Sequence, residues 1–135
     1  DVFVATAAVA DWRAAEVSAA KIKKTTDRRV PALALVENPD ILAAVAALAK
    51  PPYCVGFAAE SDNLLAHARD KMKRKKVPLI VANIGADTFG EDDNAITLVD
   101  AGGEQAWPRA GKLALARRLV AEIATRLGSA ARSLG

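Results

Sequence analysis

The chain has 135 residues, of which 52% are hydrophobic and 26% charged, so it can form one domain with its own core and is not expected to be disordered. A net charge of +3 permits binding to a polyanion without requiring it. The single Cys54 and single His67 exclude an internal disulfide and any site within this chain that needs several cysteines or two imidazoles. No apolar stretch is long enough to span a membrane and no signal sequence opens the chain, so we expect a cytoplasmic protein.

Apolar runs of strand length alternate with helical patterns along the chain. The strands are expected at residues 1–6, 30–36, 53–57, 78–82 and 95–99, with a short sixth strand at 104–107. Between the first two strands, residues 14–29 show no sustained period and are expected to form a mobile loop. The order of strands and helices is typical of right-handed crossovers in a parallel sheet.

Three helices are expected, each with a start or stop signal. In the first, Asn38 is a cap and Pro39 the first helical residue, and Pro51 marks its end. Ser61 caps a helix to about residue 76, and a third helix covers 109–127 with Gly128 as its stop. The inward stripe of the third helix is predicted to be Leu113, Ala116, Val120, Ile123 and Leu127.

These elements predict an α/β protein, a three-layer Rossmann-like fold with a mostly parallel sheet. Because the chain opens within an expected strand, the N-terminal part of the domain is expected to be missing. Ligands of such folds bind beyond the carboxyl ends of the strands. This rule selects four segments, which are residues 6–29, 37–40, 56–61 and 83–94.

Several groups in or near these segments suit an anionic ligand, although each also has an ordinary structural explanation. The backbone N–H groups after Asn38 can hold a base edge or a phosphate, or simply begin a capped helix. The run from Lys21 to Lys24 can close over a phosphate, or be a solvated lysine cluster. Lys71 and Lys75 share a helix face, where a bound anion would offset their repulsion; the alternative is an outer solvated face.

Other residues offer weaker signals. Asp11 can orient a sugar or base or reach a magnesium ion, and Trp12 can stack on a base or pack at the edge of the core. The small residues of the segment 56–60 would let a ligand approach the backbone. We expect His67 to lie on the surface and Cys54 to be a buried structural thiol.

Taken in order, five segments resemble those of phosphopantothenoylcysteine synthetase. They are ATAAVADWR from Ala5, KIKK from Lys21, NPDI from Asn38, GFAAE from Gly56, and Asn83 followed by Phe89 and Asp92–Asn94. In bacteria this synthetase is usually the C-terminal part of a bifunctional synthetase/decarboxylase of coenzyme A biosynthesis. The resemblance implies that residues 1–128 are the CTP-binding part of the synthetase domain and that residues 129–135 are a C-terminal tail.

The resemblance also implies an activity and a site. The family joins 4′-phosphopantothenate to L-cysteine through an acyl-cytidylate, with CTP as co-substrate and Mg²⁺ assisting, and it forms homodimers with the ATAAVAD region near the interface. Lys21 would be the catalytic residue, on a strap over the intermediate. The metal ligands stay open, and no nucleic acid or membrane partner is expected. The nucleotide-binding residues implied by motif are Ala5, Thr6, Ala7, Asp11, Lys21, Pro39, Asp40, Ile41, Leu42, Phe57, Lys71 and Lys75.

The sequence also departs from the family. A Gly-rich segment and an Asn that hold phosphopantothenate are expected upstream of Asp1 and are not in this sequence, and neither is the FMN-dependent decarboxylase domain. We therefore expect this chain to bind CTP weakly and not to complete the ligation by itself. Two alternatives stay open: a non-catalytic Rossmann-like nucleotide-binding module, and a nucleic-acid-binding domain that uses the 71–76 lysine run. The 4% aromatic content and small net charge argue against the second.

Overall fold

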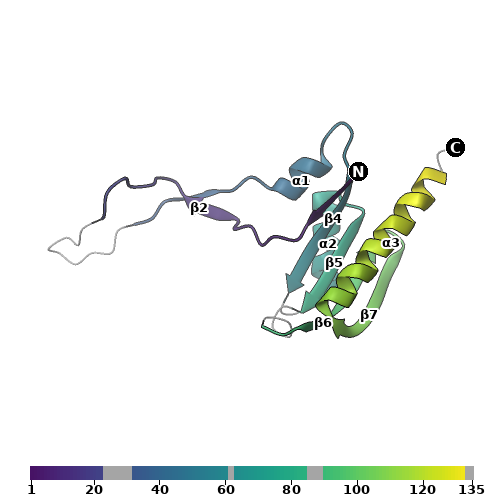
Figure 1. Cartoon of the computed structure of the whole chain (residues 1–135). Coiled ribbons are helices and arrows are strands. Elements are labelled where there is room, and N and C mark those ends of the chain that lie inside the picture. The colour runs from purple at the N-terminus through teal and green to yellow at the C-terminus, as the bar shows by residue number, and fades with distance from the viewer. Residues whose placement is uncertain (23–31, 61–62, 85–89, 133–135) are drawn as a thin grey trace. The chain divides into compact units, whose positions relative to one another are not determined.

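The structure is a computed structural model that describes residues 1–22, 32–60, 63–84 and 90–132 (Figure 1). The chain divides into two units. The sheet unit consists of Asp1–Thr6 and Leu42–Gly135, and the ribbon unit consists of Ala7–Ile41.

The sheet unit is built on a five-stranded sheet with the order β1-β4-β5-β6-β7. Its strands are β1 (Val2–Ala5), β4 (Tyr53–Glu60), β5 (Leu79–Ile84), β6 (Asp93–Asp100) and β7 (Gly103–Gly111). β1, β4 and β5 are parallel, β6 is antiparallel to β5, and β7 is antiparallel to β6. Every strand of this sheet except β6 therefore runs in the same direction, which confirms the expected mostly parallel sheet.

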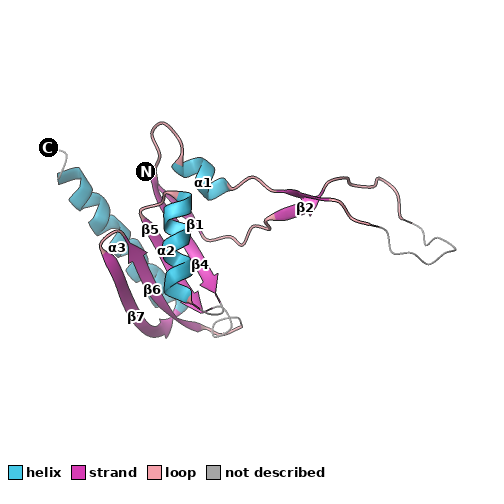
Figure 2. Ribbon diagram, turned by 180° about the vertical axis from the view of Figure 1, so that it is seen from behind, coloured by secondary structure: helices cyan, strands magenta, loops and turns pink. Residues whose placement is uncertain are grey.

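Helices cover both faces of this sheet (Figures 1 and 2). α3 (Lys112–Arg132) packs on one face, over a core that includes Val55, Val81 and Leu98. α2 (Leu64–Lys75) packs on the other face, where its Ala68 joins a second core cluster. Central strands buried on both faces need continuous apolar runs, as β4 and β5 have. The three-layer Rossmann-like architecture is confirmed, and no helix in the described part of the chain is long and apolar enough to cross a membrane.

β1 lies at one edge of the sheet. Phe3 and Ala5 pack against the core on the α2 side. Because side chains alternate along a strand, Val2 and Val4 face the α3 side, where they are 41% and 37% exposed.

The rotation of α3 differs from the prediction. Ile123 and Leu127 pack against the core as predicted. The other buried residues of the stripe are Leu115 and Leu119, whereas Leu113 and Val120 are 66% and 67% exposed and Ala116 is exposed as well. The helix carries apolar residues on two of its sides, so periodicity alone did not distinguish them. Contacts with distant residues select the observed side: Arg126 bonds Asp100, and the Arg118 guanidinium lies 4.0 Å from the centre of the Trp107 ring.

The bounds of all three predicted helices are also wrong. α3 begins at Lys112 rather than at residue 109, because residues 109–111 belong to β7. α3 continues through Gly128 to Arg132, so residues 129–132 are helical rather than a frayed tail. α1 (Ile41–Ala46) is shorter than expected and begins after Asn38, whose side chain bonds elsewhere. Ser61 lies outside the described residues, and α2 instead follows Asn63, a left-handed residue at φ 43°.

The ribbon unit contains a separate two-stranded sheet. β2 (Trp12–Ala14) pairs antiparallel with β3 (Leu35–Glu37), with Trp12 opposite Glu37 and Ala14 opposite Leu35. The expected strand at 30–36 is therefore not a member of the parallel sheet in its described part. An apolar run of strand length predicts burial in a sheet, but Leu35 is 57% exposed, so the prediction that this strand joins the parallel sheet is wrong. Ala14, expected in a loop, belongs to β2, and residues 23–29 of that loop lie outside the described residues.

Candidate nucleotide site

The carboxyl edge of the parallel strands brings β1 and β4 together. β1 ends at Ala5, opposite Gly56, whereas β4 continues beside β5 to Glu60. The N–H of Thr6 donates to the carbonyl oxygen of Val4 at 3.2 Å, in a turn directly after β1. Ala5 and Thr6 therefore lie where ligands bind in parallel α/β sheets, next to the continuing end of β4.

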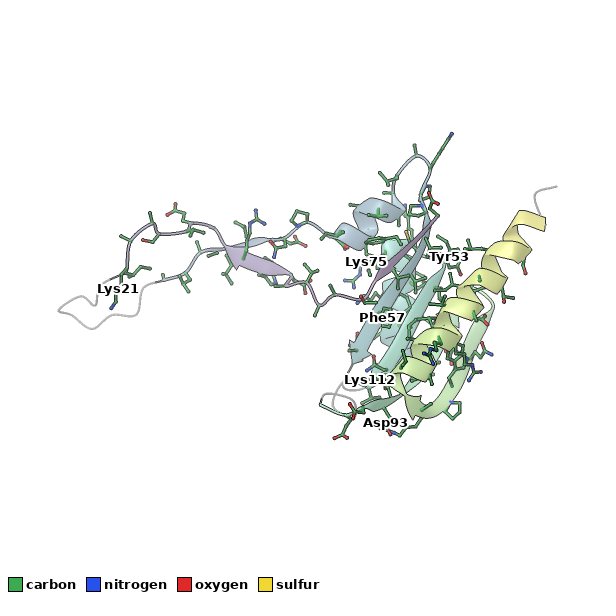
Figure 3. All side chains as sticks on the ribbon, in the orientation of Figure 1. Lys21, Tyr53, Phe57, Lys75, Asp93 and Lys112 are labelled. Carbon is green, nitrogen blue, oxygen red and sulfur yellow. The ribbon has the colours of Figure 1, made fainter. Side chains whose placement is uncertain are left out.

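Lys71 ties α2 to this edge. Its Nζ donates to the carbonyl oxygen of Phe57 at 2.7 Å. Lys75 lies one helical turn further along the same face and, like Lys71, is half-buried, whereas Lys73 and Arg74 are exposed (Figure 3). The structure thus distinguishes the two predicted lysines from the other cations of the run.

Gly56 does not serve the purpose expected of it. A Cβ on Gly56 would lie 2.7 Å from Leu42 Cδ2 and 2.8 Å from Ile80 Cδ1, so the missing side chain makes room for core packing rather than for a ligand. Ala58 is fully buried as well. The side chain of Leu42 belongs to the same core, so only its backbone can reach a ligand.

In the ribbon unit, hydrogen bonds join the segment after β3 to the segment before β2. Asn38 donates its backbone N–H to the Asp11 carbonyl at 2.8 Å and its Nδ2 to the Ala10 carbonyl at 2.7 Å. Arg13 Nη1 donates to Asn38 Oδ1 at 3.0 Å and to the Glu37 carbonyl at 2.8 Å. We call this set of four bonds the clasp. It holds the Asp11 carbonyl against the backbone of Asn38, the residue before Pro39.

Some of the predicted site residues follow directly after the clasp in the chain. Pro39, Asp40 and Ile41 are exposed and continue directly from it, whereas Lys21 is exposed and lies well beyond the paired strands (Figure 3). Ala7 is also exposed. Lys23, Lys24 and Phe89 lie outside the described residues.

Arg13 and the side chain of Asn38 were missed by sequence reasoning. They bond mainly to backbone oxygens, which residue types do not reveal. The one available signal was the position of Arg13 directly after Asp11 and Trp12 in the ADWR motif.

Several of the other polar candidates have partners within the protein. His67 Nδ1 lies 3.3 Å from Glu60 Oε2, and His67 is on the surface as expected. Asp93 pairs with Arg109 at 2.5 Å. No three His, Cys, Asp or Glu side chains in the described ranges form a cluster able to hold a metal ion.

Asp100, at the end of β6, and Cys54, in the core part of β4, have shifted pKa values. Burial alone would raise the pKa of Asp100, but the hydrogen bond from Arg126 at 2.6 Å and that from the Gly102 N–H at 2.7 Å outweigh it and lower the pKa. Burial raises the pKa of the Cys54 thiol, which is 1% exposed and hence inert, as expected. Asp100 stabilises the fold through its hydrogen bonds, and Cys54 fills space in the core.

Known proteins resemble this chain over nearly its whole length. Coenzyme A biosynthesis bifunctional protein CoaBC of Vibrio vulnificus strain YJ016 is 41% identical over 132 residues, which are 95% of this chain and 33% of that protein. The CoaBC protein of Escherichia coli K12 is 44% identical over 131 residues, covering 93% and 32%. This chain thus spans about a third of the length of these relatives.

The fold has a close match among solved structures. A crystal structure of the C-terminal domain of CoaBC superposes with a TM-score of 0.73 at 28% identity, covering 96% of this chain and 56% of that one. The profile of a family described as the DNA/pantothenate metabolism flavoprotein C-terminal domain matches residues 1–127. This chain belongs to the DNA/pantothenate metabolism flavoprotein C-terminal domain family.

Proposed function

We propose that this chain is the CTP-binding part of a phosphopantothenate–cysteine ligase of coenzyme A biosynthesis. Family membership and the CoaBC relatives support the pathway. One structural observation carries the nucleotide assignment: Lys71, half-buried on α2, bonds the Phe57 carbonyl beside the end of β1. A cation held at the carboxyl edge of parallel strands is suited to an anionic ligand.

The proposed reaction has two group transfers. The carboxylate of 4′-phosphopantothenate attacks the α-phosphorus of CTP, the bond to the β-phosphate oxygen breaks, and pyrophosphate leaves. The amine of cysteine then attacks the acyl carbonyl, and CMP leaves with the electron pair of the broken acyl–oxygen bond as an amide forms. Both steps develop negative charge on phosphate oxygens, which positioned ammonium groups stabilise.

We assign the proposed roles within each unit by itself. In the sheet unit, we assign Lys71 and Lys75 to the phosphates and the backbone around Ala5, Thr6 and Phe57 to the nucleotide. In the ribbon unit, we assign Asp11 and the 39–41 segment to the sugar or base. Lys21, also in the ribbon unit, is assigned to the reacting phosphate.

Mg²⁺ enters this proposal as part of the nucleotide substrate. The described residues form no cluster of three metal ligands, so they do not fit a protein-only magnesium site. Mg²⁺ commonly binds through substrate phosphates with one or two carboxylates.

The ribbon supports a homodimer. A two-stranded sheet is marginal alone, and many of the ribbon's apolar side chains are exposed, with Leu33 at 70% and Trp12 at 58%. We propose that a second copy of the chain covers them. Light scattering of the purified protein should give twice the monomer mass, and a monomer at micromolar concentration would contradict the dimer.

Isothermal titration with MgCTP tests the nucleotide site. Lys71→Met and Lys75→Met should each weaken CTP binding about tenfold, the loss of one charge-assisted hydrogen bond. Lys73→Met, on the exposed face of the same helix, is the matched control and should bind as the wild type does. Equal effects of all three changes would indicate only a general loss of positive charge. Equal binding of ATP, NADPH and CTP would instead favour a general nucleotide-binding module.

The turnover rate tests the proposed catalytic role of Lys21. In the intact enzyme, Lys21→Gln should abolish ligation while leaving the thermal unfolding temperature unchanged, because Lys21 is exposed. A wild-type rate in this variant would remove Lys21 from the mechanism.

A further inference from the structure

We infer that Arg13 and Asn38 are positioning residues that hold the two nucleotide-contacting segments of the ribbon unit together, and this inference rests on the proposed function. The residues assigned to the nucleotide in this unit come from two segments, around Asp11 and around Pro39. The two are far apart in the sequence, and in the described ribbon the pairing of β2 with β3 ends at Trp12 and Glu37. Beyond that pair, the clasp joins them.

Asn38 is the centre of the clasp. Its backbone N–H, its Nδ2 and its Oδ1 each take part in a different bond, to Asp11, Ala10 and Arg13. Only Asn and Gln side chains combine an amide donor with a carbonyl acceptor, and Gln is longer. Among the described ribbon residues, Asn38 is the one half-buried residue, and the others are exposed.

Arg13 closes the clasp through a single nitrogen. Its Nη1 reaches both the Glu37 carbonyl and Asn38 Oδ1. A bond from a charged donor is stronger than one from a neutral donor. Because Oδ1 accepts from Arg13, the Asn38 amide is oriented with its Nδ2 toward Ala10.

The consequence is a preorganised turn. Asn38 bonds the carbonyl oxygens of both Ala10 and Asp11. These two bonds restrict the backbone on which the Asp11 carboxylate is carried. Without them, nucleotide binding would have to order both segments, and the entropy of that ordering would weaken affinity. Arg13 and Asn38 thus act through Asp11 and Pro39.

The test is MgCTP affinity of the intact protein, measured for single and double variants. Arg13→Met should weaken binding about tenfold. Asn38→Asp keeps the oxygen that accepts from Arg13 but loses the donor to the Ala10 carbonyl. Its loss of MgCTP affinity should therefore be smaller than that of Arg13→Met. Asn38→Ala, which removes both the donor and the acceptor, should weaken binding about as much as Arg13→Met. In the double variant Arg13→Met/Asn38→Ala the two losses of affinity should not add, because both changes disrupt the same clasp.

Two controls separate positioning from general damage. Glu37→Ala removes a side chain but not the carbonyl that Arg13 bonds, so affinity should stay within about twofold. In steady-state assays of the intact enzyme, Arg13→Met should raise the KM for CTP and leave the KM for cysteine unchanged. In the same variant, hydrogen exchange at the Asn38 N–H should be faster than in the wild type.

The outcomes are distinguishable. Absence of CTP binding by the wild type would overturn the proposed function, and this inference with it, before any variant is made. If the wild type binds and Lys71→Met weakens binding, but Arg13→Met does not, the proposed function stands and the clasp inference is overturned. Additive losses in the double variant, or an equal loss in Glu37→Ala, would also overturn it.

Discussion

Replacing Gly56 by alanine tests the packing between α1 and β4. The added Cβ would lie 2.7 Å from Leu42 Cδ2 and 2.8 Å from Ile80 Cδ1, and ordinary contact begins at 3.4 Å, so each atom must withdraw by about 0.6–0.7 Å. Ile80 is fully buried and Leu42 is 9% exposed, which leaves them little room. Overpacking of this kind costs about 1–3 kcal/mol.

A smaller effect opposes this cost. Alanine in a strand is favoured over glycine by about 0.5–1 kcal/mol, because glycine loses more backbone entropy on folding. We therefore expect Gly56→Ala to lower the free energy of unfolding by about 0.5–2 kcal/mol and the melting temperature by several degrees.

Urea unfolding of matched variants is the assay. Gly111 is the control, because it is also in a strand and a Cβ there would meet nothing within 4 Å; Gly111→Ala should be neutral or slightly stabilising. Ile80→Val removes Cδ1, one of the two atoms that the new Cβ would crowd. The loss of unfolding free energy caused by Ile80→Val should therefore be smaller in the Gly56→Ala background than in the wild type. Equal stability of the Gly56 and Gly111 variants would refute the reasoning.

Two further predictions concern α3 and its ion pair. Leu119→Ala should destabilise the protein by about 2–4 kcal/mol and Val120→Ala by less than about 0.5 kcal/mol, and the reverse order in urea unfolding would restore the originally predicted rotation. Because the pKa of Asp100 is lowered, its contribution is complete above its usual value of 3.8 and is lost as the pH falls through the lower folded value. Asp100→Asn, which weakens the bond from Arg126, should therefore cost about 1–2 kcal/mol at pH 7 and progressively less below pH 3.8, and a constant cost across this range would contradict the assignment.

The parts of the fold that sequence predicted well are those set by local pattern. β4 and β5 are apolar over most of their length because both faces are buried, and few other structures suit such runs. The rotation of α3 was not predictable in this way. It depends on Arg126 meeting Asp100 and on Arg118 covering Trp107, and these contacts join residues far apart in the chain.

The candidate site shows the same division. Lys71 and Lys75 could be predicted to share one helix face from their spacing alone, and the structure places both half-buried. The bond from Lys71 to the Phe57 carbonyl could not be predicted from the sequence, and neither could the clasp. Both depend on backbone carbonyl oxygens, which every residue has. The strand at 30–36 was assigned to the wrong sheet because the apolar residues 33–36 have the same pattern whether they pair inside a large sheet or in an exposed ribbon.

The exposed edge at β1 has a practical consequence for work with this polypeptide. In the part of the chain that the structure describes, β1 pairs with β4 on one side and with no strand on the other. Another extended segment can add to such an edge, and the exposed Val2 and Val4 favour an apolar one. Aggregation during purification would then begin at this edge. A lysine in place of Val4 would discourage such growth while leaving the lysine pair on α2 untouched.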